Sequence, residues 1–306
     1  MQKFGIDISV WQKGFDFDKA KADGVEFAIL RGAYHLSKDK CFEDFYATCK
    51  ARNIPVGVYL YSKAKTIAAA RQEAEYLISK VLIGKRFEYP IYMDVEADVQ
   101  LALGKELLTE IIIEFCETLE VAGYYVGVYS TAAVFRDCTH ENKLLPYDKW
   151  IAHWARKCSY TGDYGMWQFG GETNLLRNNK VAGKVCDQDY AYKDYPAIIR
   201  SAGLNGYGKF ADVPETDVEA ETPKADSVVK LDYAKKFTRT IAGKYKVNSA
   251  IGLKLRTGAS TFKQIIETMS NGSTFTCYGY HTGSWYYGIS SSGKEGFCHK
   301  SLLLRK

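Results

Sequence analysis

The stretch that decides the fold is Ile91-Tyr92-Met93-Asp94-Val95-Glu96, an apolar run that ends in two carboxylates. Side chains two positions apart on a β-strand point to the same side, so Asp94 and Glu96 are predicted to face the same way at the end of one strand. In a barrel of parallel strands this end is the mouth, where catalytic residues gather. The pair alone is common, and a solvated strand end is the alternative interpretation.

Similar β-branched and aromatic runs recur through the first two thirds of the chain, with helical segments between them. Eight strands are expected, at residues 4–9, 27–32, 56–62, 91–96, 126–130, 150–154, 166–169 and 185–190. Apolar periodicity predicts helices at residues 17–21, 41–51, 66–82, 106–122 and 197–202. After residue 126 the connections are too short or too polar for full helices. The pattern predicts an α/β fold, an irregular TIM-like barrel with an incomplete helical ring.

Charge and composition change after this predicted barrel. Residues 1–204 carry a net charge of −1 and residues 205–226 a net charge of −4, whereas residues 227–306 carry +10, within a total of +5. Prolines, glycines and acidic residues in the middle stretch indicate a linker. Short strands separated by turn signals are expected at residues 243–247, 253–257, 274–280, 285–289 and 296–299, which predicts a small all-β barrel. The expected organisation is a barrel at residues 1–204, a linker at 205–239 and a second domain at 240–306.

Two further carboxylates are expected at the same mouth. Asp7 lies near the end of the first predicted strand and Asp187 lies in the last one. The ends of the first, fourth and eighth strands of a barrel converge, and four carboxylates brought together are costly unless they serve a function. Neighbouring acids titrate apart, so one stays protonated as a general acid while another is ionised and stabilises positive charge. A glycosidase needs this division of labour.

Five motifs in the barrel region carry a family resemblance. They are Gly5-Ile6-Asp7-Ile8-Ser9, Asp94-Val95-Glu96, Trp150-Ile151-Ala152, Trp167-Gln168-Phe169 and Asp187-Gln188-Asp189. In this order and spacing they resemble glycoside hydrolase family 25, the muramidases or Chalaropsis-type lysozymes of many bacteriophage endolysins. The resemblance implies cleavage of the β-1,4 bond from N-acetylmuramic acid to N-acetylglucosamine in peptidoglycan. It also implies Glu96 as proton donor, Asp94 as the residue that orients the 2-acetamido group or stabilises positive charge, and Asp7 and Asp187 as the rest of the cleft.

The last motif departs from the family pattern, which usually reads Val-Asp-x-Asn. Here Cys186 and Asp189 stand at its first and last positions, so the choice between Asp187 and Asp189 stays open, with Asp187 favoured because it matches the first acid. The attacking group, a protein carboxylate or the substrate's own acetamido group, also stays open.

Aromatic side chains are expected to line a saccharide groove, because rings stack on the C–H faces of sugars. The candidates for substrate binding are Tyr61, Trp154 and Trp167, with Gln168 beside them. A place in the core is the alternative for each aromatic residue.

The tail carries a second resemblance, over residues 240–306. Its segments Lys244-Tyr245-Lys246-Val247, Leu253-Lys254-Leu255-Arg256-Thr257-Gly258 and Gly283-Ser284-Trp285-Tyr286 are similar to the bacterial SH3 domain of wall hydrolases. The resemblance implies a small SH3-like, cell-wall-binding domain in which Trp285 and Tyr286 are the expected contacts. Its positive charge suits anionic wall polymers. A basic β-barrel without a ligand is the alternative.

Composition narrows the cellular setting. No apolar run reaches the ~18 residues of a membrane span, and residues 1–17 lack the apolar core of a secretory signal. We therefore expect synthesis in a host cytoplasm, no membrane insertion, and access to the wall through a separately made, holin-type pore. The eight cysteines are scattered singly, which favours reduced thiols over a zinc site, with disulfides as the alternative outside a cell. No cofactor or metal is expected.

Three other classes of protein compete with this interpretation. A non-catalytic peptidoglycan-binding protein is the alternative, but it would be expected to lack one of the paired acids, and both are present. A nucleic-acid-binding protein would explain the basic tail and leave the acidic cleft unexplained, so no nucleic-acid partner is expected. A Cys/His peptidase would need a cysteine in a recognisable nucleophile context, and the sequence offers none.

Overall fold

A computed structural model describes residues 2–207, 236–249, 252–260 and 263–306 of the chain. The chain divides into two compact units, residues 1–211 and 212–306. Most of the predicted linker lies outside the described residues.

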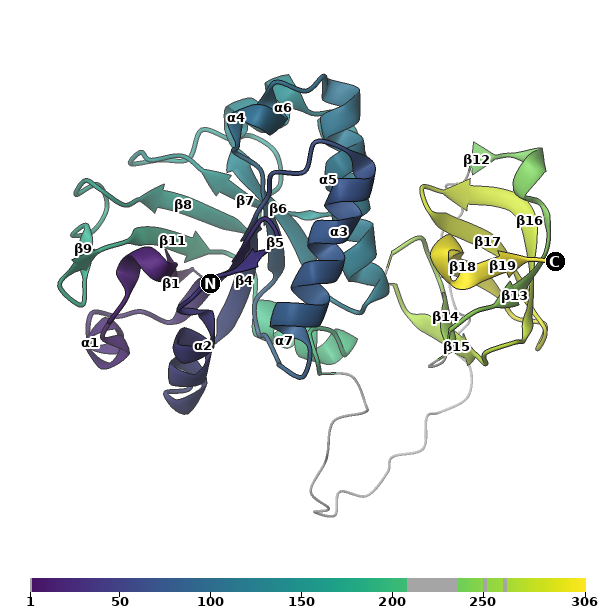
Figure 1. Cartoon of the computed structure of the whole chain (residues 1–306), viewed down its shortest axis with the longest axis horizontal. Helices are drawn as coiled ribbons and strands as arrows, with labels where there is room; N and C mark the ends of the chain where they lie inside the picture. Colours follow the sequence, from purple (N-terminus) through teal and green to yellow (C-terminus); the bar gives the residue numbers. More distant parts are fainter. Residues whose placement is uncertain (1, 208–235, 250–251, 261–262) are drawn as a thin grey trace, which may run out of the picture. The chain divides into compact units, whose positions relative to one another are not determined.

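The first unit is a closed barrel of eight strands. Its main sheet follows the order β1-β11-β8-β7-β6-β5-β4-β2-β3, and a direct pairing of β1 with β2 closes it, which leaves β3 as a short addition to β2. Figure 1 shows β8, β11 and β1 side by side. The strands are β1 (Lys3–Ile8), β2 (Phe27–Tyr34), β3 (Ser37–Lys38), β4 (Val56–Tyr61), β5 (Ile91–Asp94), β6 (Val126–Thr131), β7 (Asp148–Ala152), β8 (Met166–Gly170) and β11 (Asp187–Ala191). A separate two-stranded sheet joins β9 (Lys180–Val181) and β10 (Lys184–Val185). The predicted eight-stranded α/β barrel is confirmed.

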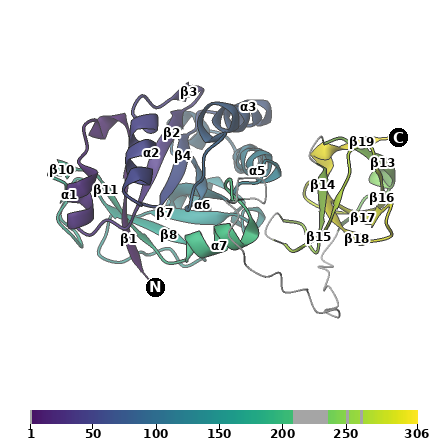
Figure 2. The ribbon, with the colours of Figure 1, turned by 90° about the horizontal axis from the view of Figure 1, so that it is seen from below.

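Helices surround only part of this barrel. They are α1 (Phe17–Ala22), α2 (Phe42–Ala51), α3 (Ile67–Leu77), α4 (Asp98–Leu101), α5 (Lys105–Val121), α6 (Ala132–Cys138) and α7 (Tyr195–Ala202). The α3 helix continues as a π-helical turn, Ile78–Leu82, and packs beside α5 (Figure 2). Between α6 and α7 the described chain has only the 3-10 turn Glu141–Lys143, so β7, β8 and β11 are joined without α-helices. The helical ring is therefore incomplete, as expected, although α4 and α6 were not predicted.

The alternation of side chains along β5 separates the two sides of the barrel wall. Ile91 and Met93 are fully buried in the apolar cluster that includes residues of the surrounding helices. Tyr92 points the other way and packs in the barrel interior against Trp150, with ring centroids 5.2 Å apart. Asp94 follows Tyr92 by two positions, so it shares the interior side, at the strand's carboxyl end.

The last strand runs against its neighbours. The barrel strands β1, β2, β4, β5, β6, β7 and β8 pair in parallel with one another, whereas β11 is antiparallel to both β1 and β8. The start of β11 therefore lies at the same end of the barrel as the carboxyl ends of the other strands. In this register Asp187 stands opposite Asp7.

The second unit is all-β in its described part. Its strands are β12 (Lys236–Phe237), β13 (Gly243–Val247), β14 (Leu253–Arg256), β15 (Ile265–Met269), β16 (Thr274–Thr282), β17 (Trp285–Ser290), β18 (Glu295–His299) and β19 (Leu303–Arg305). They form one sheet in the order β15-β14-β18-β17-β16-β13-β19, with β12 paired to β16. Buried apolar side chains, including Val247, Leu255 and Phe275, make its core. Five of these strands were predicted, while β12, β15 and β19 were not.

Two expectations about thiols and membranes are addressed by the fold. The eight cysteines are free thiols, and all but Cys138 and Cys158 are buried. In the described part of the chain, no helix combines the length and the apolar character that crossing a membrane requires.

Candidate active site

Four acidic side chains meet at the mouth of the barrel. Asp7 and Asp94 are buried, with 6% and 4% of their surfaces exposed, at the carboxyl ends of β1 and β5. Asp187 is half-buried at the start of β11, and Glu96 is exposed just beyond β5. The sequence predicted all four for this mouth, and the antiparallel direction of β11 explains how Asp187 reaches it.

Glu96 lies at the junction of two hollows. One, the acid hollow, has a volume of about 300 Å³ and is lined by residues that include Asp7, Asp94, Glu96 and Asp187. The other, the Trp154 hollow, has a volume of about 570 Å³ and is also lined by Glu96. Because both hollows contain Glu96 in their walls, an extended ligand that occupies both would pass directly over its carboxyl group.

Gln168 connects the acids to the aromatic wall of the Trp154 hollow. Its Nε2 donates to Asp7 Oδ2 at 2.9 Å, while its Oε1 accepts hydrogen bonds from Tyr129 at 2.9 Å and from Trp154 Nε1 at 3.0 Å. The amide is therefore held in one orientation, and the indole of Trp154 is fixed with 43% of its surface exposed. An oriented, exposed indole is suited to stacking on a sugar.

The other two predicted aromatic residues lie in different places. Tyr61 lines the acid hollow and stacks on Tyr34, with ring centroids 4.8 Å apart. Trp167 is buried with 5% of its surface exposed, packs against Phe169 and donates to the carbonyl of His153 at 2.8 Å. Tyr61 is thus available to a ligand, whereas Trp167 has the core position that the sequence left as the alternative.

Burial raises the pKa of every acid at the mouth. For Asp94 the cause is burial first, then the charges of Glu96 and Asp7. For Asp187, burial and the charges of Glu96 and Glu172 raise the pKa to about 6. The pKa of Glu96 is raised by burial alone, because part of its carboxyl group is shielded although the side chain is open to the hollows. Each acid at the mouth therefore ionises less readily than an exposed acid does.

Asp94 has a buried carboxylate oxygen without a partner. Its Oδ1 accepts no hydrogen bond from any group in the described part of the chain. Such an atom costs free energy unless a proton or an external donor satisfies it. Since Asp94 lines the acid hollow, a ligand N–H or O–H in that hollow is within its reach.

The sequence left open the choice between Asp187 and Asp189, and the fold separates them. Asp187 lines the acid hollow, whereas Asp189 is fully buried beneath it and accepts a hydrogen bond from Trp150 Nε1 at 2.8 Å. Only Asp187 is positioned to touch a ligand. Asp189 can act only through its neighbours.

Several residues at the mouth were missed by the sequence interpretation. Trp11 is 82% exposed beside the acid hollow, in a 3-10 turn capped by Ser9 and Gln12. Arg31 also lines this hollow and pairs with Asp39 at 2.8 Å. The Ser-x-x-Gln capping pattern directly after the first strand is a signal that could have identified the turn. The partnership of Arg31 depends on the tertiary fold.

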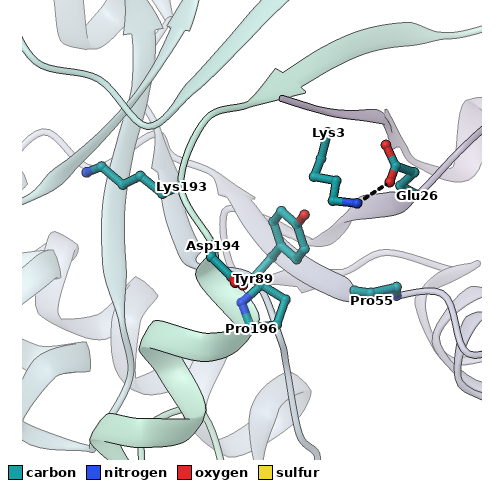
Figure 3. A pocket seen from close by; sticks show the side chains of 7 residues that line it. All are labelled: Lys3, Glu26, Pro55, Tyr89, Lys193, Asp194 and Pro196. Atoms are coloured by element: carbon teal, nitrogen blue, oxygen red, sulfur yellow. Dashed lines mark hydrogen bonds and ion pairs between the residues drawn. The ribbon is translucent and has the colours of Figure 1, made fainter. Parts of the chain in front are cut away.

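A hollow at the opposite end of the barrel differs from the mouth in its chemistry. It has a volume of about 230 Å³, and Tyr89 stands at its centre (Figure 3). Glu26 is paired with Lys3 at 2.5 Å, and Asp194 caps α7 by accepting from the Ala197 amide at 3.1 Å. Because both carboxylates in its lining already have partners, this hollow lacks the unpaired acids of the mouth.

In the second unit, the two predicted wall contacts differ in exposure. Trp285 is buried with 6% of its surface exposed and packs edge-on against His299, with centroids 5.3 Å apart. Tyr286 is half-buried and packs against Tyr245.

Comparisons with known proteins agree with this geometry. The family model described as "Glycosyl hydrolases family 25" matches residues 6–176. No curated protein sequence matches the chain.

Solved structures with a similar fold include an endolysin, an autolysin and a lysozyme. The CTP1L endolysin is 21% identical, with a TM-score of 0.56 over 65% of this chain and 70% of that one. The autolysin LytC from Streptococcus pneumoniae, solved with a synthetic peptidoglycan ligand, is 26% identical, with a TM-score of 0.53 over 62% of this chain and 47% of that one. The bacterial lysozyme from Streptomyces coelicolor is 21% identical, with a TM-score of 0.54 over 67% of this chain and 98% of that one.

Proposed function

The chain belongs to the glycosyl hydrolases of family 25, and on that premise we propose that it is an endolysin-type N-acetylmuramidase. It hydrolyses the β-1,4 bond between N-acetylmuramic acid and N-acetylglucosamine in bacterial peptidoglycan. The observation that carries this proposal is the position of Glu96, which lines both hollows and has Asp94 beside it. A glycan lying through both hollows would present a glycosidic oxygen to that carboxyl group.

Glu96 is the proposed proton donor. A bound glycan covers its exposed carboxyl group, which adds to the burial that already raises its pKa and keeps the proton in place until the reaction. The proton passes to the glycosidic oxygen as the bond to the anomeric carbon breaks. Water then adds to the anomeric carbon and returns a proton to Glu96, so the enzyme is regenerated.

Asp94 is the proposed partner of the acetamido group. Asp94 lines a hollow large enough for a sugar, its Oδ1 is an acceptor without a partner, and an acetamido N–H is a matching donor. Held in this way, the acetamido group is oriented and the positive charge that develops at the anomeric carbon is stabilised. Asp7 and Asp187 complete the negative surround, and Trp154 and Tyr61 provide stacking surfaces.

The second unit is the proposed wall-binding domain, an SH3-like module over residues 240–306. Its positive charge supports binding to peptidoglycan and to anionic wall polymers. Tyr286 is the proposed contact, and the buried Trp285 supports it from within the fold. As an endolysin, the enzyme would reach the wall through a separately made membrane pore.

The proposal is tested by Glu96→Gln. The amide has nearly the same shape but no proton to donate, so clearing of purified cell walls should fall by about 10² or more. Binding to the same walls in a pelleting assay should be unchanged. The matched control is Glu75→Gln, an exposed position on α3, which should clear walls like the wild type. Clearing by Glu96→Gln at the wild-type rate would overturn the assignment, and wild-type protein that binds walls without clearing them would indicate a non-catalytic binder.

A further inference from the structure

Asp189 is buried beneath the catalytic mouth and faces the same side of β11 as Asp187. None of its surface is exposed. In the pairing of β1 with β11 it stands opposite Gly5, while Asp187 stands opposite Asp7. Asp189 and Asp7 are therefore diagonal neighbours on one face of the sheet, a relation in which side chains reach each other. Their carboxyl groups lie within hydrogen-bond reach.

The hydrogen bonds of Asp189 account for only one of its two oxygens. Its Oδ1 accepts from Trp150 Nε1 at 2.8 Å. Its Oδ2 is buried, and no N–H or hydroxyl group of the described chain donates to it. An ionised carboxylate held in this way would leave a full charge desolvated beside a second acid, at a cost of several kcal/mol.

In the described part of the chain, the groups that act most strongly on the Asp189 carboxyl carry no positive charge. They are Asp7 from β1, Tyr92 from β5, Trp150 from β7, Asp187 from the same strand as Asp189, and Cys186 directly before that strand. All of these are acidic or neutral. Arg31, the cation in the acid hollow, is paired with Asp39.

We propose that Asp189 is a positioning residue that keeps a proton on Oδ2 and donates it in a hydrogen bond to Asp7. The two carboxyl groups then share a single negative charge, which resides on Asp7. Asp7 receives one hydrogen bond from Gln168 Nε2 at 2.9 Å and a second from Asp189, so its charge is fixed at the floor of the mouth. The role of that charge in catalysis rests on the proposed function. The location of the proton does not.

The electrostatics of the pair agree with this assignment. Burial raises the pKa of both carboxyl groups, and the charge of Asp7 raises the pKa of Asp189 further. The hydrogen bonds from Gln168 and Asp189 act in the opposite direction on Asp7 and lower its pKa. Of the two acids, Asp7 therefore releases its proton first.

The location of the proton is tested by the stability of Asp189→Asn, which needs no substrate. An acid whose pKa is raised by folding binds its proton more tightly in the folded state. Its contribution to stability is therefore complete below the unfolded pKa and is lost as the pH rises toward the folded pKa. Asparagine keeps a donor at every pH and has no proton to lose. As the pH is raised from about 4, the melting temperature of Asp189→Asn should therefore rise progressively relative to that of the wild type.

The control for this measurement is Asp163→Asn, which removes a carboxylate from an exposed loop position. Its melting temperature should follow that of the wild type at a constant offset over the same range. A constant offset for Asp189→Asn as well would contradict the proposal, because no proton would then be bound at Asp189 on folding.

The positioning role is tested by activity on purified walls. Asp189→Asn, whose amide donates to Asp7 and accepts from Trp150, should keep activity within about threefold of the wild type, whereas Asp189→Leu, which does neither, should lose about tenfold or more in kcat. A strong loss in Asp189→Asn, with its pH-dependent gain in stability still present, would overturn the positioning role. If the wild type itself failed to cleave walls, only the proposed function would fall, since the melting experiment would still report the proton.

Discussion

At the scale of single residues, the sharpest prediction concerns the unpaired Oδ1 of Asp94. If Oδ1 accepts the hydrogen bond of the acetamido N–H, Asp94→Asn replaces the carboxylate with a neutral amide. That amide orients the acetamido group and stabilises the positive charge at the anomeric carbon less well. Cleavage should fall by about 10² or more while the fold is kept. Peptidoglycan that has been chemically de-N-acetylated should be cleaved slowly by the wild type.

De-N-acetylated peptidoglycan also distinguishes a hydrogen bond between Asp94 and the acetamido group from a purely electrostatic role of Asp94. For Asp94→Asn, removal of the acetyl group should cause little additional loss, because the interaction is already broken. Equal sensitivity of the wild type and Asp94→Asn to de-N-acetylation would show that Asp94 does not act through the acetamido group.

Individual catalytic candidates were predictable from sequence where a local rule applied. Asp94 and Glu96 follow from the alternation of side chains along one strand, and that strand is fixed by its own apolar residues. The partners of these acids could not be predicted in the same way. The hydrogen bond from Gln168 to Asp7 and the burial of Trp167 join positions far apart in the sequence, so they depend on how the barrel closes.

At the scale of elements, the loop after β8 shows how tightly the mouth is packed. A Cβ atom added at Gly171 would lie 2.1 Å from Asp187 Oδ1 and 2.9 Å from the ring of Trp154. Only a residue without a side chain lets this backbone pass between the acid and the indole. The glycine therefore sets the width of the groove at this point.

Gly171→Ala should displace Asp187 or Trp154. Because this changes the shape of the groove, kcat/KM on purified walls should fall by about tenfold. The control is Gly104→Ala, at an exposed position before α5 where an added Cβ meets no atom within 4 Å. That variant should keep full activity. If Gly171→Ala also cleaved walls at the wild-type rate, the close approach of Asp187 and Trp154 would have no functional importance.

The number of barrel strands was predictable because each strand has its own apolar run, but their directions were not. The lengths of the connections do not reveal the antiparallel course of β11, because β7 and β8 are also joined without an α-helix and still pair in parallel. This course places the start of the strand, and so Asp187, at the mouth. The strands β12, β15 and β19 were missed because they are short or lack a clear apolar alternation.

At the scale of the whole molecule, the division into two units predicts separable functions. Asn205 was assigned to the linker from sequence, yet it is fully buried, donates to the carbonyl of Tyr89 at 2.9 Å and accepts from the Tyr125 amide at 2.7 Å. A fragment of the barrel should therefore extend to Tyr207. Residues 1–207 should cleave purified walls but bind whole cells weakly.

The complementary fragment, residues 227–306, should bind cells without lysing them. If its charge of +10 supplies much of the attraction, binding should weaken as salt is raised and the screening length falls below about 8 Å. Binding that does not change with salt would point to a specific pocket in place of charge, and a fragment that binds no wall would remove the targeting role.

The central claim, that the acids at the mouth cleave the glycosidic bond at the anomeric carbon of N-acetylmuramic acid, is tested most directly by product analysis. Purified peptidoglycan is digested, its new reducing ends are reduced with borohydride, and the fragments are identified by mass spectrometry. The account predicts reduced ends on N-acetylmuramic acid with the wild type and none with Glu96→Gln. Reduced ends on N-acetylglucosamine, or new free amino groups from peptide cleavage, would contradict it.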